Sequence, residues 1–168
     1  EVTGAVVFAG IEGSRPVLVE IEALVAPSTL ASPRRNVVGW DSSRLAMLTA
    51  VLEARCGVPL SGRDIFLNVA GGLKISETAA DLAVAAALIS SVSGRPAPPR
   101  SVFFGEVALS AELRQVAQAD ARLKEAAKLG FDMAVMPKPR KKLGAPSGLS
   151  IAQPSTLAEL IEIMGGVT

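Results

Sequence analysis

Between residues 76 and 128 the chain carries side chains suited to nucleophilic chemistry. Ser76 and Thr78 offer hydroxyls, and Lys124 and Lys128 offer amines. A hydroxyl needs a base beside it to attack a carbonyl, and a lysine serves as that base only when desolvation lowers its pKa by several units. The two groups must also lie within hydrogen-bond reach of each other. One candidate activity is therefore peptide hydrolysis, with Thr78 and Lys124 as the pair.

The composition excludes most other catalytic sites. The chain has no histidine, which removes Ser-His-Asp triads, histidine bases and nearly all catalytic zinc sites. Its one cysteine, Cys56, allows neither an internal disulfide nor a cysteine-cluster metal site, and we expect it to be a buried structural thiol. A small-molecule phosphotransferase needs a glycine-rich phosphate loop. The Gly71-Gly72 pair is the one candidate for such a loop, but it lacks the further glycines, and no G-x-x-x-x-G-K-[ST] motif occurs.

Length and composition indicate one globular domain. The chain has 168 residues, of which 49% are hydrophobic and 20% charged, with a net charge of +1, too apolar and too balanced for a disordered tail. No apolar stretch reaches the roughly 18 residues of a membrane-spanning helix, because Glu53, Asp81 and Arg122 interrupt the candidates. Since the first residue is Glu1 and no signal segment precedes the fold, we expect a domain excised from a longer cytoplasmic protein without a membrane partner.

The first half of the chain shows the clearest secondary-structure signals. Alternating apolar residues predict strands over residues 2–8 and 16–25, paired as a hairpin. Apolar residues at helical spacing then predict a helix over residues 42–56. Either Asp41 or Ser42 is its expected N-cap, because both side chains can accept a hydrogen bond from the first turn.

A second helix, over residues 78–91, is apolar on all sides and is therefore expected to be buried at the centre. Thr78 is its expected N-cap, with Asp81 at the capping-box position, and Thr156 and Glu159 form a similar box before the last helix. Further hairpin strands, single strands and helices are expected at residues 64–69, 102–109, 112–116, 120–129, 131–136, 149–152 and 157–164. Strands and helices are interleaved without strict β-α-β alternation, so the fold class is α+β in a single domain.

Two segments resemble the proteolytic domain of Lon-type proteases, a variant of the ribosomal protein S5 domain 2-like fold. Residues 71–90 read GGLKISETAADLAVAAALIS and are similar, without gaps, to the Lon segment PKDGPSAG and the small-residue helix after it. Residues 105–130 read GEVALSAELRQVAQADARLKEAAKLG and are similar to the Lon segment that ends in the helix bearing the base lysine. The resemblance implies a Lon-like fold for residues 1–168.

The same resemblance places Ala79 at the Lon nucleophile and Asp120 at the base lysine. Ala79 has no hydroxyl, Asp120 has the opposite charge, and Asp81 replaces a Lon glycine. Thr78 is one residue away, and one residue along a helix turns the side chain by about 100 degrees. The resemblance therefore implies no catalytic residue in this chain, with the displaced pair of Thr78 and Lys124 as the alternative.

Several ordered motifs resemble the C-terminal domain of the bacterial RadA (Sms) family of DNA repair proteins. They are PRR at 33–35 followed by Gly39, DSSRL at 41–45, VAGGLKISETAADLAVA at 69–85, FFGEVAL at 103–109 and RLKEAAKLGF at 122–131. Members of that family carry a zinc finger and a RecA-type ATPase core before this domain, form hexameric rings and drive branch migration during recombination. The resemblance implies a proteolytically inactive scaffold in a homo-hexameric ring, with single-stranded and branched DNA and a RecA-type recombinase as partners.

The resemblance also implies no cofactor in this domain, since ATP, Mg and Zn belong to the missing domains. It carries the role of DNA contact to Arg34, Arg35, Arg44 and Lys74. Lys138, Arg140, Lys141 and Lys142 are weaker candidates, because they form the densest positive run of the sequence, in a loop with prolines. Exposed guanidinium and ammonium groups suit phosphates. Charges in solvated loops are the alternative, and Arg44 has Asp41 as a possible partner three residues away. A pure oligomerisation domain without DNA contact is the further alternative.

Overall fold

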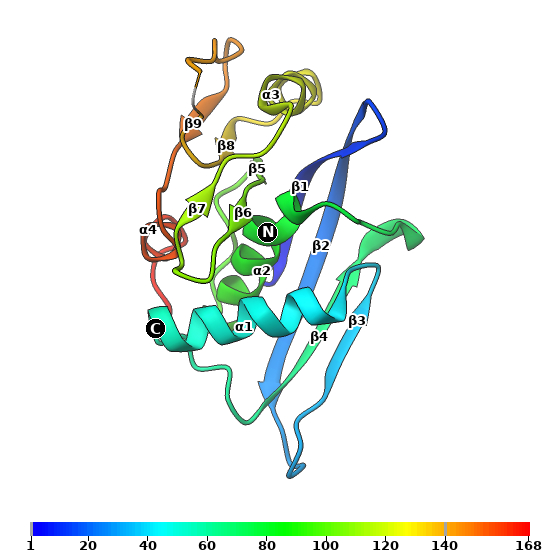
Figure 1. The fold of residues 1–168 in the computed structure, drawn as a ribbon, viewed down its shortest axis with the longest axis vertical. Helices are drawn as coiled ribbons and strands as arrows, with labels where there is room; N and C mark the ends of the chain where they lie inside the picture. Colours follow the sequence, from blue (N-terminus) through cyan, green and yellow to red (C-terminus); the bar gives the residue numbers. More distant parts are fainter. Residues whose placement is uncertain (1, 140) are drawn as a thin grey trace.

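A seven-stranded mixed sheet forms the frame of the protein (Figure 1). The computed structural model describes residues 2–139 and 141–168, and in them the strand order is β3-β4-β2-β1-β5-β8-β9. The strands of this sheet are β1 (Ala5–Glu12), β2 (Arg15–Pro27), β3 (Arg35–Val38), β4 (Arg63–Val69), β5 (Ser101–Phe103), β8 (Met133–Val135) and β9 (Ser150–Ala152). A separate two-stranded sheet pairs β6 (Glu106–Val107) with β7 (Leu113–Arg114). The helices are α1 (Ser42–Cys56), α2 (Asp81–Ser93), α3 (Ala119–Lys128) and α4 (Leu157–Ile163).

The first hairpin is confirmed and is longer than predicted. β1 and β2 pair antiparallel along the whole of β1, with Phe8 opposite Val19. Along β2 the inward residues are buried, whereas Leu24 on the opposite face is 56% exposed. The period-two pattern in the sequence therefore reports a strand with one buried face.

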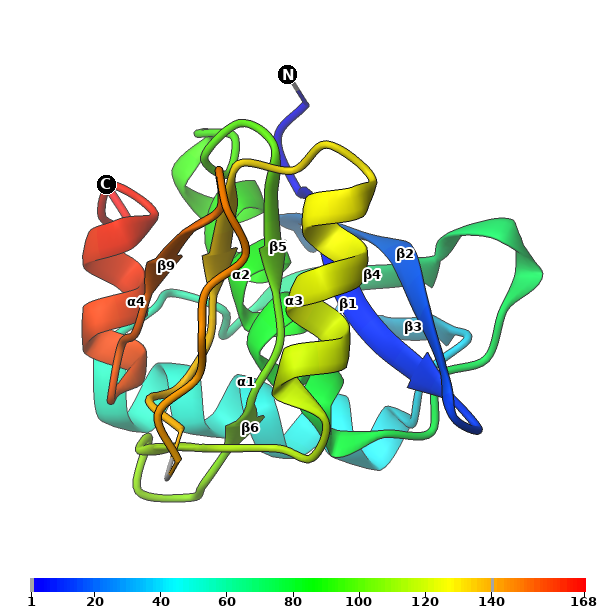
Figure 2. The same cartoon turned by 90° about the horizontal axis from the view of Figure 1, so that it is seen from above.

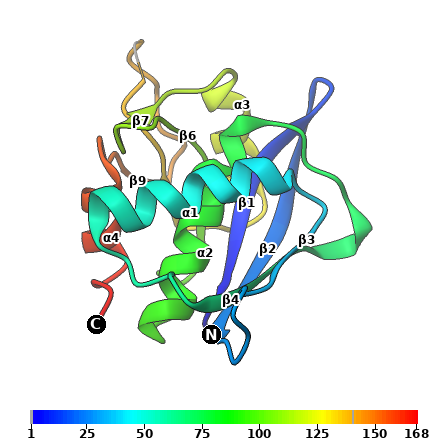
Figure 3. The same cartoon turned by 60° about the horizontal axis from the view of Figure 1, so that its bottom comes forward.

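Helices α1 and α2 cover that buried face, and α1 lies across α2 (Figure 3). Asp41 caps α1 by accepting from the N–H of Ser43, and Gly57 ends the helix in the left-handed conformation. The expectation of a buried central helix is confirmed, because every α2 residue from 81 to 90 is buried. Ser90 at the end of this run accepts a hydrogen bond from the N–H of Gly4, which fixes α2 against the start of the hairpin.

Two predictions about the strands are corrected. β3 lies within residues 27–40, a range whose sequence indicates only a polar stretch, and it pairs parallel with β4. The start of β3 is fixed from outside the strand, because the N–H of Arg34 donates to Asp64 at 2.6 Å. The second hairpin is much shorter than residues 102–116, since β5 joins the main sheet between β1 and β8 and only β6 and β7 pair with each other.

The C-terminal third forms the other end of the sheet (Figure 2). α3 contacts β1 and β2, and α4 contacts α1 and α2. The hydroxyl of Thr156 accepts from the N–H of Glu159 as expected, but the Glu159 carboxylate accepts from Ser155 rather than from Thr156. The whole is the expected α+β, Lon-protease-like variant of the ribosomal protein S5 domain 2-like fold.

Candidate functional site

Ala79, which the Lon resemblance assigns to the nucleophile position, lies in a short 3-10 turn, η2 (Thr78–Ala80), which leads directly into α2. Ala79 is buried, and its carbonyl accepts a hydrogen bond from the N–H of Gly105 at 2.8 Å. The prediction that Thr78 caps α2 is wrong, because α2 begins at Asp81 without a side-chain cap. The carbonyl of Thr78 instead accepts from the N–H of Asp81, since the turn runs straight into the helix.

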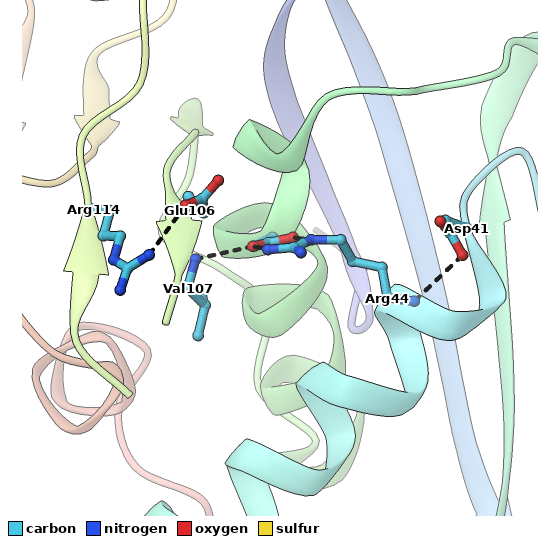
Figure 4. Close-up of polar contacts among 6 residues, drawn as sticks. Asp41, Arg44, Glu106, Val107 and Arg114 are labelled. Carbon is cyan, nitrogen blue, oxygen red and sulfur yellow. Dashed lines mark hydrogen bonds and ion pairs between the residues drawn. The ribbon is translucent and has the colours of Figure 1, made fainter. Parts of the chain in front are cut away.

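Asp81 is fully buried, and its carboxylate is held by α1 and β6. Figure 4 labels the two residues that hold it, Arg44 on α1 and Val107 on β6. Arg44 donates from Nε to Oδ1 at 2.7 Å and from Nη2 to Oδ2, and the N–H of Val107 donates to Oδ2 at 2.9 Å. Asp81 is thus a partner of two distant segments and not a capping-box residue, which corrects the sequence-based prediction. Nearby, Nη1 of Arg114 on β7 lies 3.9 Å from Oε2 of Glu106 on β6.

The pKa values of this pair reflect burial and close contact. Burial raises the pKa of Asp81, while the hydrogen bonds from Arg44 and Val107 act in the opposite direction. The hydrogen bond to Asp81 raises the pKa of Arg44, so the guanidinium remains charged. The side chain of Arg44 is 24% exposed and points to Asp81, while Asp41 receives only its backbone N–H, at 3.4 Å. The structure therefore places one DNA-contact candidate in a bidentate ion pair.

Asp120, which the resemblance assigns to the position of the Lon base, is exposed in the first turn of α3. Lys124 is exposed one turn later, and no ion pair joins these two described residues. Ser76 is exposed and Thr78 is half-buried. A lysine becomes a base when it is desolvated, and an exposed ammonium such as that of Lys124 lacks this condition.

A second buried ion pair joins Glu77 to Arg122. Arg122 is 3% exposed and donates to Oε1 of Glu77 at 2.6 Å and to the carbonyl of Ala9 at 2.8 Å. Oε2 of Glu77 accepts from the N–H of Ile11 at 2.7 Å. β5 pairs with β1 only at Val7 and Phe8, so this ion pair satisfies the backbone of β1 where β5 no longer does. An edge that could accept another strand is thereby closed.

Arg34 and Arg35 lie exposed at the start of β3. The Nε of Arg34 is 3.7 Å from Asp64, and Arg35 donates to the carbonyls of Arg34 and Arg63. The hydrogen bond from the N–H of Arg34 lowers the pKa of Asp64, with smaller contributions from Ser28 and from the two guanidinium groups. Two arginines, Arg34 and Arg35, therefore lie near one carboxylate, and Asp64 is the member of this group that the sequence analysis missed.

Lys74 lies beyond the opposite end of β3. The N–H of its neighbour Ile75 donates to the carbonyl of Gly39 at 2.8 Å, which ties the loop after β4 to the loop after β3. Gly39 has φ +87, and a Cβ there would lie 2.6 Å from the carbonyl of Leu73, so only glycine permits this contact. Lys74 is exposed, forms no ion pair with a described residue and lines a hollow of about 130 Å³ beside the β1–β2 turn.

The structure does not gather all DNA-contact candidates into one cluster. Arg34 and Lys74 are separated by the length of β3, about 13 Å for four residues. Lys138, Lys141 and Lys142 are exposed near β8 and β9, at the other end of the sheet. Arg140 lies outside the described residues. Arg34, Arg35 and Lys74 therefore follow the edge strand β3. Lys138, Lys141 and Lys142 form a separate surface.

Two further residues, Cys56 and Trp40, are only half-buried. Cys56 is half-buried at the end of α1, which corrects the expectation of a buried thiol, and burial raises its pKa. Trp40 is half-buried and packs against the hydrophobic core. Over residues 2–139 and 141–168, no three His, Cys, Asp or Glu residues lie together as a possible metal site. None of the helices in that part is long and apolar enough to cross a membrane.

The two buried arginine contacts were not found from the sequence. Arg122 lies between Ala121 and Leu123 in a helix whose other buried positions are apolar, Leu123 and Ala126. A charged residue on an apolar helix face requires a buried partner, and this was the available signal. The partner itself, Glu77, lies 45 positions earlier, and no local pattern connects the two.

Comparison with known proteins gives consistent results. The family model described as subunit ChlI of Mg-chelatase matches residues 40–140. The DNA repair protein RadA of Brucella abortus (strain 2308) is 56% identical over 158 residues, which are 94% of this chain and 34% of that protein. RadA of Rickettsia felis is 54% identical over 82% of this chain and 31% of its own length. RadA of Pseudomonas aeruginosa is 48% identical over 97% of this chain and 36% of its own length.

The chain thus spans about a third of the length of the curated relatives it matches. The ChlI model covers more than half of the chain, and the RadA proteins match nearly all of it at about half identity. The RadA matches also cover the motifs that carried the resemblance, from residue 33 to residue 131. The chain therefore belongs to the family that the ChlI model describes, and it corresponds to one domain, about a third, of the DNA repair proteins called RadA.

Proposed function

We propose that this chain is a proteolytically inactive domain of a longer RadA-type repair protein, and that it supports a hexameric ring and contacts DNA. The observation that carries the first part is the bidentate bond of Arg44 to buried Asp81, next to Ala79. In a Lon-type protease this turn presents a nucleophile. In this chain the turn carries the buried methyl group of Ala79 and is followed by the internal ion pair of Asp81 with Arg44.

Peptide hydrolysis needs a nucleophile and a base, and the residues at these two positions supply neither. Ala79 cannot form an acyl-enzyme, and Asp120 is exposed and acidic. Thr78 with Lys124 is a poor substitute, because Lys124 is exposed on α3 and water competes for its ammonium. The Glu77–Arg122 pair also occupies backbone groups of β1 that an extended peptide would need. These features favour a scaffold over an enzyme.

The DNA surface that we propose follows β3, from Arg34 and Arg35 to Lys74. Phosphate contact needs exposed cations, and all three side chains are exposed. With a net charge of only +1, one copy should bind weakly and lose affinity steeply as salt rises. A ring that presents several copies to one strand gains affinity, about 10²–10⁴-fold, by linking weak sites. Arg44 belongs to this proposal as the residue that fixes the start of α1 beside the surface.

The remaining activities belong to the part of the longer protein that this chain does not contain. We propose that ATP with Mg is used there, that Zn is bound there, and that a RecA-type recombinase is a partner of the whole protein. The proposed location is the cytoplasm, and the proposed substrates are single-stranded and branched DNA. No residue of this chain is assigned to ATP, Mg or Zn.

Two assays on the purified chain test the proposal together. Fluorescence anisotropy with labelled single-stranded and branched DNA should show binding at low salt, and a fluorogenic peptide assay with a serine-reactive probe should show neither cleavage nor labelling. Peptide cleavage that disappears in Thr78→Ala would overturn the proposal of an inactive scaffold. An assembled chain that binds no DNA at low salt would reduce the role to oligomerisation alone.

A further inference from the structure

One face of the sheet is left uncovered over β3, β4 and β2. Register places Leu24 opposite Phe66 and Val38 opposite Asn68 on this face. Leu24 is 56% and Val38 58% exposed, and Val2, 68% exposed, lies beside them. Together with Phe66 they border a shallow hollow of about 610 Å³. Exposed apolar groups gathered in this way are typical of an interaction surface.

The same face carries negative charge. Glu22 lies opposite Asn68, whose side chain donates to it at 3.3 Å, and Glu20 is on the same side of β2 two residues earlier. Both carboxylates are exposed, and neither forms an ion pair with a described residue. We call Val2, Glu20, Glu22, Leu24, Val38 and Phe66 the acidic apolar face.

At the opposite end of the sheet a second surface has the complementary character. A hollow of about 370 Å³ has Met136, Leu143 and Ile151 among its lining residues, and three lysines also line it. These are Lys138, Lys141 and Lys142, all exposed and none ion-paired with a described residue. We call this surface the lysine hollow. It combines apolar lining with positive charge, as the acidic apolar face combines apolar groups with negative charge.

We propose that the acidic apolar face of one copy docks on the lysine hollow of a second copy of this chain. The inference rests on the ring assembly proposed above and names the surfaces that would form it. The two surfaces lie at opposite ends of the strand order, β3-β4-β2 and β8-β9, so each copy contacts a different neighbour through each end. Such head-to-tail contacts repeat until a ring closes. Complementary charge sets the register, and apolar contact holds the interface.

The docking of the acidic apolar face on the lysine hollow is tested by reversing the charge of each surface and then mixing the two variants. Sedimentation velocity over a concentration series should show self-association of the wild-type chain. Glu20→Lys/Glu22→Lys and Lys141→Glu/Lys142→Glu should each weaken it, because each puts like charges on the two docking surfaces. An equimolar mixture of the two variants should restore association, since every contact in an alternating assembly is again between opposite charges. Restoration supports the proposal, whereas a mixture no better than the separate variants overturns it.

The contribution of apolar contact to self-association is tested with one variant and a matched control. Leu24→Asp should weaken self-association by about tenfold or more in dissociation constant, as loss of a central interface side chain does. Leu129→Asp, at a leucine 54% exposed at the end of α3, should leave it unchanged. Circular dichroism and thermal melting establish that both variants are folded. Equal effects of the two substitutions, or none from Leu24→Asp, contradict the proposal.

DNA binding measured on the same samples separates this inference from the proposed function. A wild-type chain that binds DNA but stays monomeric at every concentration overturns the docking proposal and leaves the DNA proposal intact. If Lys141→Glu/Lys142→Glu loses DNA affinity while assembly is unchanged, the lysines belong to the DNA surface and the docking proposal is wrong. Assembly without DNA binding supports the docking proposal and contradicts the other.

Discussion

Arg44, in the first turn of α1, donates two hydrogen bonds to the carboxylate of Asp81, 37 positions later at the start of α2. The N–H of Val107 completes the set of donors, so one buried side chain joins α1, α2 and β6. The pair lies next to Ala79, where the Lon resemblance places a nucleophile. The turn to which the Lon resemblance assigns a nucleophile thus leads, in this chain, into a buried structural ion pair.

The Arg44–Asp81 pair should contribute substantially to stability. Arg44→Ala leaves the Asp81 carboxylate buried without its main partner, and removal of one member of a buried pair costs about 3–5 kcal/mol. Urea unfolding of wild type and variant measures this difference. Arg100→Ala is the matched control, because its pair with Asp132 is 71% and 50% exposed and should contribute about 1 kcal/mol or less. Similar decreases in the two variants would contradict the role assigned to Asp81.

Restoring the Lon residues should not restore peptidase activity. In Ala79→Ser/Asp120→Lys, the new lysine lies at an exposed position of α3, where water keeps its ammonium protonated. Asp81 with Arg44 also stays where Lon has a glycine. We expect neither hydrolysis of a fluorogenic peptide nor labelling by a serine-reactive probe. Measurable hydrolysis by the double variant would show that the geometry of the site is intact and that only the two side chains differ.

Glu77 should hold the end of β1 in place. Glu77→Ala removes the acceptor of the Ile11 N–H and leaves Arg122, 3% exposed, without its carboxylate. We expect faster hydrogen exchange at Ile11 together with a loss of about 3 kcal/mol or more in unfolding free energy. Glu162→Ala, at an exposed carboxylate of α4, is the control and should change neither. Unchanged protection of Ile11 would rule out the proposed closure of this edge.

Asp64 should make the stability of the protein fall in acid. Its folded-state pKa lies below the ordinary value of 3.8, chiefly because the N–H of Arg34 donates to the carboxylate. The stabilisation is complete above the unfolded pKa and disappears as the pH falls through the lower, folded pKa. Thermal melting of wild type and Asp64→Asn from neutral pH into acid should show a smaller acid-side decline in the variant. Parallel curves would contradict the assignment.

The sequence predicted local features well because local physics determines them. Asp41 caps α1 as expected, and Gly57 ends the helix at the predicted residue 56, since capping and left-handed glycine depend on neighbouring residues alone. The apolar run after Asp81 predicted a buried helix for the same reason. The β1–β2 hairpin followed from period-two alternation.

Interactions across long sequence separations could not be predicted in this way. β3 has no clear signal, because its four residues, RNVV, follow a polar loop and pair with residues thirty positions later. The local pattern predicts a capping role for Asp81, since its partners on α1 and β6 are distant in sequence. The dyad positions at Ala79 and Asp120 stay a prediction from the family resemblance, whereas the contacts of Arg44 and Glu77 are seen only in the structure.

Binding of DNA by Arg34 and Arg35 is the central claim, and a salt series of fluorescence anisotropy tests it most directly. The comparison is Arg34→Ala/Arg35→Ala against Arg15→Ala/Arg55→Ala, which removes the same charge from two other exposed sites. We predict that the first variant binds single-stranded DNA more weakly than the second. Its slope of log affinity against log salt should also be shallower, by about 0.7 for each phosphate that the variant no longer neutralises. Equal decreases in affinity for the two variants, or no binding by wild type at low salt, would contradict the account.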